Sequence, residues 1–146
     1  MKRSVRLLLL FLTLAVAGCG LVTQAGRDLA NADALFEKGK YAEALDLYRK
    51  TLSLPHSAGR DAEARFAIAS TLAFYDNPQK NYVQALEAFE EFLKRHPNHE
   101  KAAEAQNWKH ALKTLVEEKR ECEHLKKNIE QLKRLDIRHE EKRKGR

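Results

Sequence analysis

The feature that most constrains the fold is a helical pattern that occurs twice in the chain. Each copy has a tyrosine, an alanine three residues later and an aromatic residue four residues after that. The residues are Tyr41, Ala44 and Tyr48 in the first copy and Tyr82, Ala85 and Phe89 in the second. This spacing places apolar side chains on one helical face, and the alanine lets a neighbouring helix approach closely. Pro55 and Pro97 follow the two copies and end each helix. The repeated helical pattern predicts an all-α chain.

The repeated pattern resembles the second helix of a tetratricopeptide repeat, which carries Ala-x3-Phe and a closing proline. Ala44 and Ala85 are 41 residues apart, whereas the family period is roughly 34. The excess is placed in residues 55–60 and 76–81. The resemblance covers residues 25–118 and implies a short stack of helical hairpins, with two repeats and a capping helix. A bundle of helical hairpins without repeat geometry is the alternative.

The capping helix is predicted to begin near Glu100, with Asn98 as its N-terminal cap. Four of its side chains are expected to pack inward, namely Ala103, Ala105, Leu112 and Val116. From Glu100 to Lys144 the chain has no proline or glycine, so one long helix is predicted to continue into the tail.

The end of the second copy, residues 89–98, is similar to repeats of periplasmic and outer-membrane proteins. One example is the lipoprotein subunit of the outer-membrane β-barrel assembly machine. In the repeat family, ligands lie on the concave face formed by the first helix of each repeat. Transferred by position, the resemblance implies that this face carries Leu29, Asp33, Phe36, Phe66, Ser70, Ala73, Phe74, Lys101, Glu104 and Trp108. The candidate partner-binding residues are Phe36, Phe66, Phe74 and Trp108. The alternative is that these aromatic side chains belong to the core.

The first 18 residues are predicted to be a signal peptide. A basic start is followed by the apolar residues 7–17, roughly 11 residues, which is shorter than the ~20 that a membrane-spanning helix needs. The run Val16-Ala17-Gly18-Cys19 resembles the cleavage site of bacterial lipoproteins. This resemblance implies that Cys19 is lipidated and becomes the mature N-terminus, with residues 19–24 as a tether. An ordinary secretory signal or an uncleaved anchor remains open.

Charge is divided unevenly between the repeats and the tail. Residues 19–118 carry 13 basic and 15 acidic side chains, whereas residues 119–146 carry 11 basic and 6 acidic ones. The two regions therefore have net charges of −2 and +5. An exported protein does not meet nucleic acid, so anionic lipid, peptidoglycan or an acidic protein surface is the expected partner of the tail.

The tail is predicted to be a helix with a short coiled-coil seam, at Leu115, Cys122, Leu125, Ile129 and Leu132. Glu118 and Asp136 interrupt this seam. About two heptads are marginal alone, so the tail is expected to need a partner. Two tails in parallel could form a homodimer with an interchain Cys122 disulfide. The alternative is that Cys122 is a small buried apolar residue. A single solvated helix is the other alternative for the tail.

The sequence contains no recognisable catalytic motif, and His96-x-x-His99 lacks a third ligand nearby. We therefore expect no enzymatic activity, no metal and no cofactor other than the lipid on Cys19. The function predicted is a membrane-anchored periplasmic scaffold for protein–protein interaction, accessory to envelope biogenesis. Gly20 after the cysteine favours the periplasmic face of the outer membrane, under the enterobacterial sorting rule. The alternatives are a structural spacer between outer membrane and cell wall, and an accessory lipoprotein of an envelope sensor kinase. Residues 129–137 resemble such accessory lipoproteins over a short stretch.

Overall fold

The fold is all-α, as predicted. The computed structural model describes residues 24–55 and 57–145, and no strand occurs within them. Residues 24–37 are helical. They are followed by α2 (Tyr41–Ser53), α3 (Ala58–Ala73), α4 (Tyr82–Arg95) and α5 (Ala102–Lys144). The predicted signal peptide and Cys19 lie outside the described residues, as does the tether except for Gln24.

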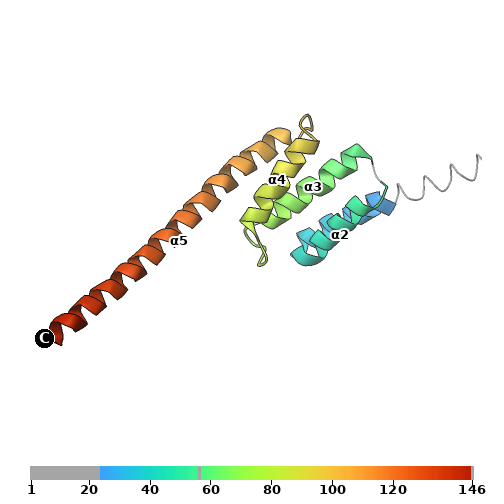
Figure 1. Ribbon diagram of the computed structural model, residues 1–146. Coiled ribbons are helices and arrows are strands. Elements are labelled where there is room, and N and C mark those ends of the chain that lie inside the picture. Colours follow the sequence, from blue (N-terminus) through green and yellow to red (C-terminus); the bar gives the residue numbers. More distant parts are fainter. Residues whose placement is uncertain (1–23, 56, 146) are drawn as a thin grey trace, which may run out of the picture.

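The helices from α2 onward pack as a series of hairpins, α3 against α2 and α4 and then α4 against α5 (Figure 1). Figure 1 also shows α5 starting beside the end of α4 and projecting far beyond the other helices. This arrangement confirms the prediction of a short tetratricopeptide-like stack with a long C-terminal helix. None of the described helices is long and apolar enough to cross a bilayer.

Alanines mark the places where helices approach most closely. Ala44 and Ala85, the central residues of the repeated pattern, are completely buried. Ala32, Ala64 and Ala105 on the neighbouring helices are also completely buried. Because a methyl group occupies little space, the backbones can approach and larger side chains close the core above and below. Those larger side chains include Tyr48 and Phe89, the aromatic residues that end the two patterns.

The turns between helices use specific backbone and side-chain caps. Gly39 has φ +73°, and the N–H groups of Gly39 and Lys40 donate to the carbonyls of Phe36 and Leu35. This pattern is a Schellman motif, which favours glycine because the left-handed conformation disfavours a side chain. Asn81 caps α4 by accepting a hydrogen bond from the Gln84 N–H at 3.1 Å.

The predicted cap of α5 is wrong. The helix begins at Ala102 after Lys101, and no side chain caps its first turn. The turn before α5 is closed by backbone hydrogen bonds instead, from His99 to the His96 carbonyl and from Ala102 to the His99 carbonyl. Asn98 therefore lies too far from the helix start to act as its cap.

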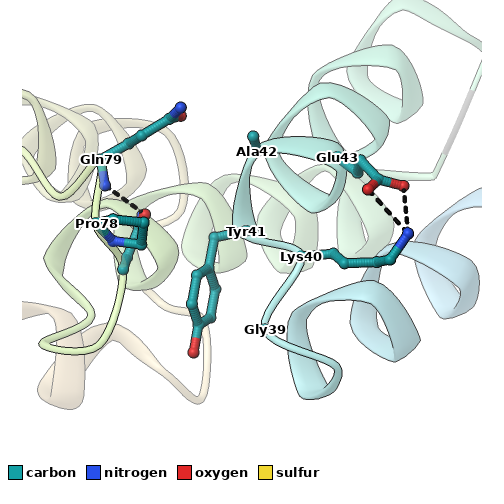
Figure 2. A pocket seen from close by; sticks show the side chains of 8 residues that line it. Gly39, Lys40, Tyr41, Ala42, Glu43, Pro78 and Gln79 are labelled. Atoms are coloured by element: carbon teal, nitrogen blue, oxygen red, sulfur yellow. Dashed lines mark hydrogen bonds and ion pairs between the residues drawn. The ribbon is translucent and has the colours of Figure 1, made fainter.

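The loop between α3 and α4 is organised by Asn77, a completely buried polar side chain. Its Nδ2 donates to the Thr71 carbonyl at 2.8 Å, and its Oδ1 accepts from the Gln79 N–H at 2.9 Å. Figure 2 shows Tyr41, at the start of α2, lying opposite the loop residues Pro78 and Gln79. Because the loop is fixed at both ends, it holds the end of α3 in a defined position.

The long helix α5 has two different halves. Ala105, Leu112 and Val116 are buried against the stack, as predicted, but Ala103 is exposed. Ala103 is two residues from Ala105, and residues two apart do not share a helix face. After Val116 every side chain through Gly145 is exposed except Asn128, which is partly buried. At 1.5 Å per residue, the 43-residue helix is about 65 Å long, so its distal part is an arm.

Candidate functional site

The main candidate site is a groove between the end of α3, the start of α4 and the first third of α5. It is open to solvent and has a volume of about 420 Å³. We define the groove by its lining residues, Ser70, Ala73, Phe74, Tyr75, Tyr82, Glu104, Trp108, Ala111, Leu112 and Leu115. The lining is mostly apolar and aromatic, which suits a site that binds an apolar side chain of a partner.

Trp108 is the largest side chain of the groove. Its ring stacks on Phe89 with the centroids 6.1 Å apart and the planes only 4° from parallel. The residue is nevertheless 40% exposed. Phe89 is fully buried and holds one face of the indole in place, so Trp108 presents a rigid aromatic surface to solvent.

The opposite wall of the groove is a second set of aromatic rings. Phe74 contacts Phe36 at a centroid distance of 4.9 Å and Tyr75 at 5.0 Å. Tyr75 is 75% exposed, whereas Phe36 is half-buried and lies behind Phe74. Phe36 therefore supports the groove without lining it.

Phe66 is a core residue, and the hypothesis that it binds a partner is not compatible with its position. It is only 7% exposed, and its ring packs edge-on against Phe89 and Phe92. The ammonium group of Lys101 lies 4.9 Å from the centre of the same ring. The four candidate partner-binding residues are thus divided between two separate aromatic clusters, with Phe36 and Phe74 in one and Phe66 and Trp108 in the other.

The other residues predicted for the concave face divide in the same way. Ser70, Ala73 and Glu104 line the groove, whereas Leu29 is buried in the N-terminal core cluster. Asp33 is exposed, and its Oδ1 accepts a hydrogen bond from the Tyr48 hydroxyl at 2.6 Å. Burial of the Tyr48 ring and the neighbouring Asp33 carboxylate raise the pKa of Tyr48 far above its ordinary value of 10.

The predicted coiled-coil seam is exposed along its whole length. Leu115 is 41% exposed and lines the groove, and Cys122 is an exposed free cysteine. The alternative in which Cys122 is a small buried apolar residue is therefore wrong. Leu125, Ile129 and Leu132 are all more than half exposed. Pairing of two tails through this seam, with or without a disulfide, stays a prediction.

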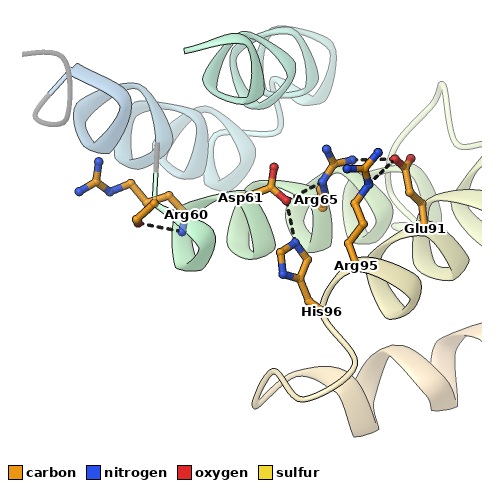
Figure 3. A network of polar contacts seen from close by, with 7 residues as sticks. Arg60, Asp61, Arg65, Glu91, Arg95 and His96 are labelled. Carbon is orange, nitrogen blue, oxygen red and sulfur yellow. Dashed lines mark hydrogen bonds and ion pairs between the residues drawn. The ribbon is translucent and has the colours of Figure 1, made fainter. Parts of the chain in front are cut away.

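The pair His96 and His99 serves structure in this chain. Figure 3 shows His96 from the end of α4 directed at Asp61 of α3, and His96 Nε2 lies 2.6 Å from Asp61 Oδ2. Arg65 donates to both Asp61 and Glu91, at 2.7 and 2.9 Å, which ties α3 to α4. Among the described residues no group of three or more His, Cys, Asp or Glu side chains could hold a metal ion. This network is best explained as a clamp between two helices.

The sequence did not predict that Tyr75 and Tyr82 line the groove, or that Asn77 is buried in the loop beside it. Tyr82 was assigned only to the repeated helical pattern, although its side chain also lines the groove. Tyr75 is the second residue after the end of α3 and precedes a polar turn, a position at which a large exposed aromatic residue is a usable signal. The sequence around Asn77 has the composition of a turn, and nothing in it shows that the side chain is buried.

Comparison with known protein families identifies the repeat. Residues 63–99 match the family model of the tetratricopeptide repeat, and this range covers most of α3 and all of α4. These two helices therefore form a tetratricopeptide-like repeat. Repeats of this kind generally bind other proteins on their concave surfaces, so the match indicates a protein–protein interaction scaffold. No curated protein and no solved structure gave a significant match to the chain.

Proposed function

We propose that the protein is a lipid-anchored scaffold that binds another envelope protein in the groove. The observation that supports this role is the pair of exposed aromatic residues across the groove, Tyr75 at 75% and Trp108 at 40% exposure. Aromatic side chains that are held rigidly and are open to solvent are typical anchors of protein interfaces. The role is binding rather than catalysis, and it requires no cofactor beyond the lipid on Cys19.

The proposed location is the periplasmic face of the outer membrane. Its support is the sequence Val16-Ala17-Gly18-Cys19 and the glycine that follows it. Several acyl chains on one cysteine would hold the protein firmly, whereas a single chain gives only marginal binding. In this location the scaffold would be accessory to envelope biogenesis.

A second candidate within the same class is an accessory lipoprotein of an envelope sensor kinase. It is favoured by the exposed distal half of α5, whose apolar residues have no contact with the stack. In that case the arm, rather than the groove, would be the main contact with the partner.

Site-specific photocrosslinking in intact cells tests the groove. A crosslinking amino acid at position 108 should trap a partner protein, whereas one at Gln106 should not. Gln106 is an exposed residue on the same helix, outside the groove lining. Equal trapping from both positions, or none from either, would contradict a role for the groove. Phe66→Ala is unsuitable for this purpose because removing a buried ring costs about 3–5 kcal/mol of stability.

The anchor is tested separately with Cys19→Ala. This variant should move from the membrane fraction to the soluble periplasmic fraction while its circular dichroism spectrum stays unchanged. Its function should be lost although the groove is intact. A variant that still sediments with outer membranes and still supports function would show that the lipid is not the anchor.

A further inference from the structure

We propose that α5 from Leu115 onward binds an amphipathic helix of a partner protein that carries acidic residues along one edge. The inference rests on the proposed role in protein binding, but it concerns a surface that shares only Leu115 with the groove. We define the tail stripe as Leu115, Cys122, Leu125, Ile129 and Leu132. We define the lysine edge as Lys119, Lys126 and Lys133.

The tail stripe has the spacing of a helix–helix contact. Its members alternate at three and four residues from Cys122 onward, with Leu115 one heptad earlier. Leu125, Ile129 and Leu132 are 53%, 51% and 64% exposed, so three branched aliphatic side chains in succession face solvent. A narrow apolar seam of this width on a single helix is the contact surface of a coiled coil rather than of a globular core.

The lysine edge borders this stripe at heptad intervals. Lys119, Lys126 and Lys133 each follow a seam position directly, and all three are exposed. None of them forms an ion pair with another residue in the described part of the chain. Residues that flank a seam in this way face the flanking residues of the opposite helix, so three carboxylates there would be complementary.

A second copy of this chain matches the surface poorly. In a parallel pair Lys126 would meet Glu121 of the other copy, but the other two lysines would meet Thr114 and Asn128. Glu118 and Asp136 would each face their own copies in the seam. An antiparallel pair brings like edges together and therefore places lysine against lysine.

An anionic membrane surface also matches less well. A helix that lies on such a surface has basic residues on both sides of its apolar face. Here the second edge of the stripe carries Thr114, Glu121, Asn128 and Leu135, none of which is basic. The asymmetry between the two edges favours a helix, because a helix can present acidic residues on one side only.

A designed peptide of about four heptads is the probe for this proposal. It carries leucine at the two seam positions and glutamate at both flanking positions, which keeps it from pairing with itself. A control peptide carries lysine at the flanking positions. Binding to the full chain with Cys19→Ser is measured by fluorescence anisotropy of the labelled peptide. We expect the acidic peptide to bind and the basic peptide to bind at least about tenfold more weakly.

Two matched triple variants locate the binding surface. The test variant changes the lysine edge, Lys119, Lys126 and Lys133, to glutamate. The control variant changes Arg120, Lys127 and Arg134 to glutamate. The control residues have the same heptad spacing and lie on the helix face opposite the stripe, so both variants change the net charge equally. The test variant should bind the acidic peptide about tenfold more weakly than the wild type and the basic peptide more tightly. The control variant should change either affinity by about twofold or less.

Three outcomes would overturn the proposal. The first is that the acidic peptide does not bind, or that both triple variants weaken it equally. The second is that the wild type sediments as a dimer that Leu125→Asn dissociates, which assigns the stripe to a second copy. The third is that phosphatidylglycerol vesicles, but not phosphatidylcholine vesicles, displace the peptide through the lysine edge. Trapping from position 108 is independent of all three, so the groove is tested apart from the tail.

Discussion

At the scale of single residues, polar atoms of buried side chains join neighbouring elements of the stack. Asn77 is completely buried and joins the end of α3 to the following loop through hydrogen bonds at 2.8 and 2.9 Å. Tyr48 is 3% exposed and joins α2 to the preceding helix through Asp33. Both side chains have partners for their buried polar atoms, which is why burial of these groups is tolerated.

Replacement of Tyr48 by phenylalanine should lower stability at neutral pH and make the loss of stability at alkaline pH less steep. The variant loses the hydrogen bond to Asp33, so we expect its free energy of unfolding at neutral pH to fall by about 1 kcal/mol. Because folding raises the pKa of Tyr48, its contribution is fully present below the ordinary value of 10 and is lost as the pH rises further.

Urea unfolding at neutral pH, at about pH 9 and at about pH 11 checks both parts of this prediction. The wild type should lose stability over the alkaline interval more steeply than Tyr48→Phe. Tyr75→Phe is the control, because Tyr75 is 75% exposed and its hydroxyl should contribute little. Parallel alkaline curves for wild type and Tyr48→Phe would show that the Tyr48 hydroxyl is not coupled to folding.

At the scale of elements, α5 combines a packed helix and a free one without a break. Its buried residues end at Val116, although the helix continues to Lys144. Helix propensity alone stabilises an isolated segment of this length only marginally. The part of α5 that packs on α4 therefore stabilises the helical conformation of the distal part.

Removal of residues 124–146 should leave the stack intact. No side chain in the removed segment that the structure describes is buried, so the free energy of unfolding should change by less than about 0.5 kcal/mol. Thermal and urea unfolding of the truncated protein measure this. In the full-length protein, backbone amides beyond about Glu123 should exchange with deuterium much faster than those of α3 and α4. A large loss of stability on truncation would mean that the tail packs on the stack.

The sequence predicted the helices well and the groove only in part. Ala44, Ala85, Tyr48 and Phe89 lie in the core, because helical periodicity determines which side of a helix is apolar. Periodicity does not determine which side chain of that face is covered by the next helix. Both Phe66 and Trp108 pack on α4, but Phe66 is 7% exposed and Trp108 is 40% exposed. This difference depends on how helices far apart in sequence cross. Cys19, the predicted lipidation site, lies outside the described residues.

At the scale of the whole molecule, two candidate surfaces lie on one continuous helix. The groove uses the first third of α5, and the tail stripe begins at Leu115, which belongs to both surfaces. The stack is close to neutral, whereas residues 119–146 carry a net charge of +5. The attraction of an acidic partner to the arm should therefore weaken with added salt, while contacts in the groove should persist.

The unbroken course of α5 also fixes a rotational phase between the two surfaces. Each residue of a helix turns the chain by about 100°, so one alanine inserted after Arg120 rotates the distal stripe by that angle relative to the groove. A seven-residue helical insertion falls only about 20° short of two full turns, although it lengthens the arm by about 10 Å.

If a single partner spans both surfaces, crosslinkers at positions 108 and 125 should trap the same protein in the wild type. The one-residue insertion should abolish trapping from the distal site alone, and the seven-residue insertion should restore it. If position 125 traps its partner equally well in both insertion variants, the two surfaces engage separate partners. In that case the arm would only set the distance between the two partners. A strict dependence on phase would mean that the arm also sets the angle at which the two surfaces meet one partner.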